Sequence, residues 1–238
     1  MLNNSCLFAI PEGINKKLIF NLDGIRIALQ VINLSYQRLC QSLESVSQKN
    51  EITDFTHISL DCWAFIDSLD RLRGMWNNLD KILELDRAFS KVVVDKKFEN
   101  VRNIRNIISH LPQRIDSLIS SNSSAMGEIG WIYLSDKASL NVKTYFIRYG
   151  AFYKKVNFEF TLPNTNIRFN QNNVGLIEFK VGEFIIELSN LYFFVEELVK
   201  YLEKILIAEF SQVKSSNMCP PCVFGSADLN TNGWLENT

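Results

Sequence analysis

The sequence predicts an α+β protein that is mainly α: an up-and-down bundle of four to five helices, with a small antiparallel β-sheet inserted before the last helix. Three observations support this. After an irregular lead-in over residues 1–13, apolar residues recur at helical spacing to the end of the first bundle segment (1–120). They follow a period of two within residues 125–188, and the helical period returns in residues 189–213. The last helix cannot bury its apolar stripe alone, so we expect it to complete the first bundle.

The length, composition and net charge of the chain narrow the class of protein. The chain has 238 residues and is 47% apolar, which is enough for a sizeable core. Its net charge of −1 argues against a surface coated for nucleic acid. Residues 87–114 nevertheless hold seven basic and two acidic side chains, a local charge of +5. Five scattered cysteines, no signal-peptide pattern and no apolar run of ~20 residues predict a reduced, cytoplasmic protein without a membrane partner.

The first two helices have the clearest periodicity. From Ile14 to Val46 the apolar positions advance by alternating steps of three and four, which predicts one long helix with a possible break at Asp23-Gly24. A second helix is expected from an N-cap at Thr53 or Asp54 to Leu79. Trp63 lies off its core stripe, so we expect Trp63 to pack on the β region or on a second subunit, with ligand stacking as the alternative.

Further elements follow in order. We expect a short helix over residues 79–90, and a central helix from Val94 or Asp95 to Ser120 that Pro112 bends. A Ser-rich linker at residues 120–124 precedes about five strands. The expected strands are 130–134, 143–149, 156–162, 176–180 and 183–188, with a tight turn at Val181-Gly182.

The end of the chain is predicted to be a helix and a tail. A last helix is expected over residues 189–212, capped by Ser189 or Asn190. Residues 214–238 are polar and read as a flexible tail that contains Cys219-Pro-Pro-Cys222. This Cys pair has no second pair to complete a zinc site, so we interpret it as part of a structureless tail, with a redox or shared-metal role as the alternative.

The central helix carries the most specific motif. Arg105-Asn106-Ile-Ile-Ser-His110 is an Arg, a polar residue, three residues and a His. This pattern resembles the signature of the HEPN superfamily. The resemblance implies a helical bundle, often dimeric. Many members are metal-independent ribonucleases of toxin–antitoxin and phage-defence systems, whereas others have lost activity and serve as binding or scaffold modules.

The motif residues could support phosphodiester cleavage without a metal or another cofactor. His110 can transfer protons near neutral pH, Arg105 can hold a phosphate with two donors, and Asn106 can orient the imidazole ring or bind phosphate. Arg105 and His110 lie ~140° apart around one helix, which is awkward for a single copy. A homodimer would solve this, and the resemblance implies such a composite site.

Simpler interpretations stay open. Arg105 and His110 could line a polar face and pair with carboxylates such as Asp67 or Asp70. We therefore expect a catalytically inert module that binds nucleic acid or a protein partner such as an antitoxin. The alternative is a ribonuclease that uses Arg105, Asn106 and His110 across a homodimer. In either case the expected contacts to RNA are Lys97, Arg102 and Arg105.

Overall fold

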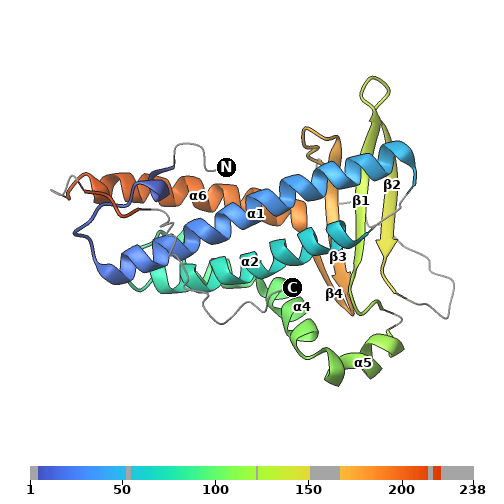
Figure 1. Cartoon of the computed structure of the whole chain (residues 1–238), viewed down its shortest axis with the longest axis horizontal. Coiled ribbons are helices and arrows are strands. Elements are labelled where there is room, and N and C mark those ends of the chain that lie inside the picture. The colour runs from blue at the N-terminus through green and yellow to red at the C-terminus, as the bar shows by residue number, and fades with distance from the viewer. Residues whose placement is uncertain (1–4, 52–54, 122, 151–166, 214–216, 221–238) are drawn as a thin grey trace, which may run out of the picture.

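The computed structural model describes residues 5–51, 55–121, 123–150, 167–213 and 217–220 (Figure 1). The α+β, mainly α class is confirmed, because the described part of the chain is mainly helical and contains a small antiparallel sheet, whereas the predicted bundle of four to five helices matches only roughly. The elements are η1 (Cys6–Phe8), α1 (Lys16–Lys49), α2 (Thr56–Leu79), η2 (Arg87–Phe89), α3 (Lys91–Lys97), α4 (Glu99–Ser109), α5 (Leu111–Ser120), β1 (Glu128–Asp136), β2 (Asn141–Arg148), β3 (Val174–Val181), β4 (Phe184–Glu187) and α6 (Leu188–Phe210).

Three long helices and the sheet share one hydrophobic core. Helices α1, α2 and α6 run side by side, and the sheet stands at the end of the molecule where α1 ends and α2 begins (Figure 1). Buried residues from these helices and from the strands form a single cluster. By length and composition alone α1 could cross a membrane, and half of its most apolar window is buried inside the protein.

Helix α1 is continuous, so the predicted break at Asp23-Gly24 is wrong. The side chain of Asn15 caps its start by accepting a hydrogen bond from the Lys17 amide, at 2.8 Å. Gly24 serves packing between helices, because a Cβ atom there would lie 3.1 Å from the side chain of Met75 on α2. The helix ends at Asn50, which adopts the left-handed conformation (φ 51°).

The predicted central helix is divided into α3, α4 and α5. The first division is at Phe98, whose buried ring packs edge-on against Phe194 of α6 with ring centres 5.7 Å apart. The second is at His110, because Pro112 lies in the first turn of α5 and has no N–H to continue the helical bonds of α4. The bend that Pro112 predicts is therefore confirmed.

The short helix predicted over residues 79–90 is not formed. This segment consists of turns and the 3-10 helix η2.

The described strands form an antiparallel sheet in the order β2-β1-β3-β4. Strands β3 and β4 form the expected hairpin, but its two turn residues are Gly182 and Glu183, one position later than predicted, because Val181 pairs with Phe184. Gly182 has φ 60°, which suits a two-residue hairpin turn. The predicted strand at residues 156–162 lies outside the described residues.

Near the C-terminus, the predicted cap of α6 is wrong and the predicted tail is corrected in part. Ser189 does not cap α6; its hydroxyl accepts a hydrogen bond from the Ile177 amide at 3.0 Å and so ties α6 to β3. Part of the predicted tail is paired with the start of the chain. The Glu12 amide donates to the Asn217 carbonyl at 2.9 Å, and the Cys219 amide donates to the Ile10 carbonyl at 2.8 Å. Residues 214–216 and 221–238, including Cys222, lie outside the described residues.

Aromatic residues join the sheet to the helices. Trp63 of α2 packs edge-on against Phe179 of β3 at 5.2 Å, which confirms the expected packing of Trp63 on the β region. Trp131 of β1 stacks on Tyr145 of β2, and its indole Nε1 donates to the Ser47 hydroxyl of α1 at 2.9 Å. Ser47 in turn donates to the Leu43 carbonyl.

Ser47→Ala is expected to lower the free energy of unfolding by about 1–3 kcal/mol, because it leaves the buried indole N–H of Trp131 without an acceptor. Urea denaturation followed by tryptophan fluorescence would measure the loss. Ser45→Ala on the same helix is the matched control, since the Ser45 side chain forms no hydrogen bond with any of the residues that the structure describes. Equal losses in the two variants would contradict a structural role for the Trp131–Ser47 bond.

Candidate functional site

The Arg105 side chain of the predicted motif is held by carboxylates of α2. Its Nε donates to Asp67 Oδ1 at 3.0 Å, and its Nη1 donates to Asp70 Oδ2. Asp67 and Asp70 are three residues apart, so they lie on one face of α2. This is the pairing that the simpler interpretation of the sequence named, and it joins α4 to α2.

A second arginine extends this arrangement into a network. Arg73 of α2 binds Asp70 at 3.0 Å and Asp95 of α3 at 2.9 Å, and Asp95 also accepts a hydrogen bond from Asn77. Burial alone would raise the pKa of Asp95, but the bonds from Asn77 and Arg73 outweigh it and lower that pKa. The two arginines and three aspartates sum to a charge of −1. The positive charges of Arg73 and Arg105 are therefore fully balanced by the aspartates of the network.

Asn106 and His110 are placed differently from Arg105. Both are exposed, and the His110 amide donates to the Asn106 carbonyl at 3.2 Å. His110 lies at the junction of α4 and α5, and no side-chain partner of its imidazole is seen within the described residues. Arg102, one turn before Asn106, is also exposed. The structure thus directs Arg105 toward α2 while His110 stands at the exposed end of α4.

A polar cleft lies between α4, α5 and the β3–β4 turn. Its volume is about 430 Å³, and it is lined by Asn103 and Asn106 of α4, by Arg114 and three serines of α5 and its end, and by Gly182, Glu183 and Phe184. Arg114 and Glu183 are its charged members and carry opposite charges. The cleft can therefore offer hydrogen bonds to a polar group without a strong field of either sign.

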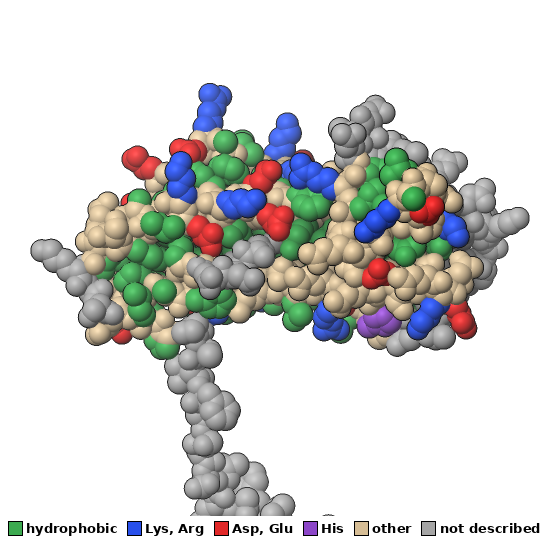
Figure 2. Space-filling view, turned by 90° about the horizontal axis from the view of Figure 1, so that it is seen from above, with side chains coloured by type: hydrophobic (Ala, Val, Ile, Leu, Met, Phe, Trp, Pro, Cys, Tyr) green, Lys and Arg blue, Asp and Glu red, His purple; other side chains and the backbone are tan. Residues whose placement is uncertain are grey.

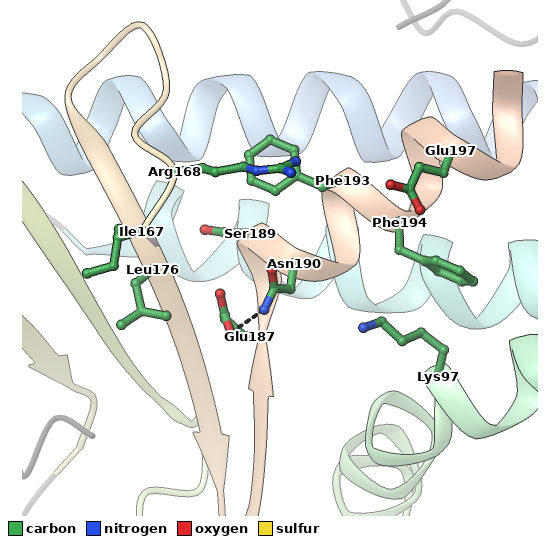
Figure 3. Close-up of a pocket in the computed structure, with 10 residues that line it drawn as sticks. All are labelled: Lys97, Ile167, Arg168, Leu176, Glu187, Ser189, Asn190, Phe193, Phe194 and Glu197. Atoms are coloured by element: carbon green, nitrogen blue, oxygen red, sulfur yellow. Dashed lines mark hydrogen bonds between the residues drawn. The ribbon is translucent and has the colours of Figure 1, made fainter. Parts of the chain in front are cut away.

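A second cavity, of about 300 Å³, lies beside the first turn of α6 (Figure 3). Arg168 covers the ring of Phe193 at 5.4 Å, and Lys97 lies over the ring of Phe194 at 5.7 Å. Glu187 accepts a hydrogen bond from Asn190 at 2.5 Å. With Glu197 the lining holds two cations and two carboxylates, so it has no net charge. Nothing in the sequence periodicity marked Arg168, because it becomes part of a site only through the folding of α6 against β3.

Two carboxylates meet on the sheet beside this cavity. Glu178 of β3 is paired across the strands with Glu187 of β4. Burial raises the pKa of both, and the neighbouring charge of Glu187 raises that of Glu178 further. The charge of Lys97 acts in the opposite direction on the pKa of Glu187. Lys97, predicted to contact nucleic acid, is therefore near enough for its charge to act on this carboxylate, and both side chains line the same cavity.

Charges of both signs are mixed on the visible surface. On the face shown in Figure 2, Lys and Arg side chains alternate with Asp, Glu and apolar side chains and form no patch of a single sign. Among the described residues, no three His, Cys, Asp or Glu side chains are placed to share a metal ion. Comparisons with protein-family models, with curated proteins and with solved structures found no match to this chain.

Arg105→Ala is expected to lower the free energy of unfolding by about 1–2 kcal/mol, because Asp67 loses its partner and Asp70 keeps only Arg73. This value is discounted for the partial exposure of the Arg105–Asp67 pair. Arg102→Ala, one turn earlier on the exposed face, removes the same charge and is expected to change stability by less than about 0.5 kcal/mol. If chemical denaturation ranks the two variants equally, Arg105 does not brace α4.

Glu178→Gln is expected to raise the stability of the protein at pH 7 by about 0.5–1 kcal/mol, because it removes a like-charge neighbour of Glu187. The folded-state pKa of both groups is raised above the ordinary value of 4.5, so the wild type loses stability as the pH rises through the folded pKa. The gain should therefore vanish below pH 4.5. Thermal melts between pH 4 and pH 7 measure it, and Glu183→Gln in the adjacent exposed turn is the control. A gain that persists at pH 4 would show another cause.

Proposed function

We propose that this protein is a catalytically inert, HEPN-like helical bundle that binds a protein partner. The observation that supports this most directly is the state of Arg105. The guanidinium that a ribonuclease of this type would offer to phosphate is already bound by Asp67 and Asp70 within its own subunit. The motif in this chain then has a structural use, which is to fasten α4 to α2.

Electrostatics argue against phosphate binding at this point. A phosphate that replaced the carboxylates at Arg105 would stand among Asp67, Asp70 and Asp95, in a network whose net charge is already −1. Two like charges 4 Å apart repel by about 1 kcal/mol in water and about 4 kcal/mol near a protein surface. Such a site would weaken the transition-state charge stabilisation that phosphodiester cleavage requires.

The predicted contacts to nucleic acid are also reduced in number. Arg105 is compensated by two carboxylates, and Lys97 lies over Phe194 beside Glu187. Arg102 is exposed, and among the described residues it forms no ion pair. Because nucleic-acid affinity grows with the number of phosphates neutralised, a protein partner fits these side chains better than RNA does.

The ribonuclease alternative has one observation in its favour. His110 is exposed at the α4–α5 junction, and the neighbouring α5 carries Ile115 and Ile119, which are 48% and 68% exposed. A homodimer formed through α4 and α5 would cover these isoleucines and bring His110 toward the second copy. This arrangement is the composite site that the HEPN resemblance implies, and a toxin–antitoxin or phage-defence setting would suit it.

Purified wild-type protein is expected to leave mixed cellular RNA intact in the presence of EDTA, since its Arg105 is neutralised. Gel analysis beside His110→Ala and Arg105→Ala would check this, with Lys137→Ala in the exposed β1–β2 turn as the charge-matched control. We also expect RNA binding by fluorescence anisotropy to be weak, and to fall only slightly between 50 and 200 mM salt. Cleavage by the wild type but not by His110→Ala would overturn the inert assignment and establish the ribonuclease.

A further inference from the structure

Helix α1 has a second apolar stripe, on the side opposite to the core. Phe20, Ile27 and Leu34 follow one another at seven-residue intervals and are 73%, 49% and 55% exposed. We call these three residues the outer stripe. They span about 21 Å of a continuous helix. Single exposed apolar side chains are ordinary, but three large ones in one line on one helix form a surface that can accept another protein element.

The spacing identifies the kind of element. Residues repeated every seven positions drift only ~20° per repeat around a helix, so they form a nearly straight ridge along α1. Such a ridge packs best against a second helix that lies almost parallel or antiparallel to it. Half-buried Val31 lies between Ile27 and Leu34 and widens the ridge by one position. The outer stripe therefore fits a partner helix with about two heptads of apolar side chains.

A basic groove adjoins the start of the outer stripe. It has a volume of about 790 Å³, and Phe20 and Ile82 supply its apolar part. Lys16, Lys17 and Lys81 line it, together with three asparagines, and among the described residues no carboxylate does. Asp23, one turn further along α1, is bound to Arg26 at 2.5 Å. The groove thus carries a charge of +3 on a protein whose net charge is −1.

We propose that the outer stripe and this lysine groove together dock an amphipathic helix of a protein partner, with its acidic end on Lys16, Lys17 and Lys81. The inference rests on the proposed binding role and gives that role a surface and a partner chemistry. It does not depend on the HEPN resemblance, because the surface is on α1 and is separate from Arg105 and His110. Apolar side chains supply the contact, and charge complementarity sets the direction of the helix.

A second copy of this chain fits the surface less well. A twofold axis through Ile27 would pair Phe20 with Leu34 of the other copy. It would also set Lys16 against Arg38, since each is eleven residues from Ile27, and within the described part of the chain Arg38 pairs only with Asp61, at 3.3 Å. Like charges at both ends of the interface would oppose such a dimer. A single ridge one or two side chains wide is also narrow for lying on a membrane surface.

The test uses the full chain and two synthetic 21-residue helical peptides. Both carry Leu at heptad positions; one has Glu and the other Lys at the flanking positions and at one end. We expect the Glu peptide to bind in the micromolar range by fluorescence anisotropy, as small interfaces are weak, and the Lys peptide to bind at least tenfold more weakly. Ile27→Glu and the triple variant Lys16→Glu/Lys17→Glu/Lys81→Glu should each reduce binding of the Glu peptide at least tenfold.

Val92→Glu on α3, where Val92 is 76% exposed and outside the groove, is the matched control and should bind as the wild type does. Ile27→Ser provides a milder second variant if Ile27→Glu lowers the melting temperature. Equal binding of both peptides, or no effect of the Ile27 variants, overturns the proposal. So does a dimer in sedimentation that Ile27→Glu dissociates, or tighter binding to anionic vesicles than to the Glu peptide. None of these outcomes depends on the RNA cleavage result.

Discussion

The ion pairs of Arg105 with Asp67 and Asp70 constrain both the fold and the chemistry of this protein. Asp70 is nearly buried, and a buried carboxylate is stable only if it is paired and hydrogen-bonded. Arg105 from α4 and Arg73 from α2 meet that need, and Asp95 brings α3 into the same network. Helices α3 and α4 are thereby fixed to α2, and the same contacts occupy the guanidinium of Arg105.

Local sequence accounts well for the long elements. The alternating steps of three and four predicted helix α1, the first part of helix α2, and helix α6. The period of two predicted strands β1, β2, β3 and β4 to within a few residues of their ends. The two breaks in the predicted central helix, at Phe98 and at His110, differ in how far the sequence predicts them. Pro112 predicts the break at His110, because a proline disturbs the helical hydrogen bonds of its immediate neighbours. The break at Phe98 had no local signal, since it depends on the ring of Phe194, which is almost one hundred residues away in the chain. The roles of Ser189 and of residues 217–219 likewise follow from long-range contacts.

The candidate site shows the same division. The motif at residues 105–110 could be found from spacing alone, and the carboxylates that bind Arg105 could be named as alternatives. Which of them it binds is decided by how α4 crosses α2, and this crossing is set by packing of residues such as Val101 and Ile104 against the core. A short sequence pattern fixes which groups are present on a helix, whereas the charge available at that helix is fixed by the neighbour it packs against. This is why resemblance in a motif and competence in catalysis can separate.

Helix α1 carries two heptad-like series at once. One, from Leu18 to Leu43, is buried and holds α2, α6 and the sheet together. The other, the outer stripe, contributes nothing to that core, and exposure of Phe20 and Leu34 to water is unfavourable for an isolated protein. This arrangement would suit a binding module. Because the core already holds α1 in place, its second face can bind a partner with little further loss of conformational entropy. The proposed docking site therefore lies on a different helix from the Arg105 motif, and on one whose other face is packed into the core.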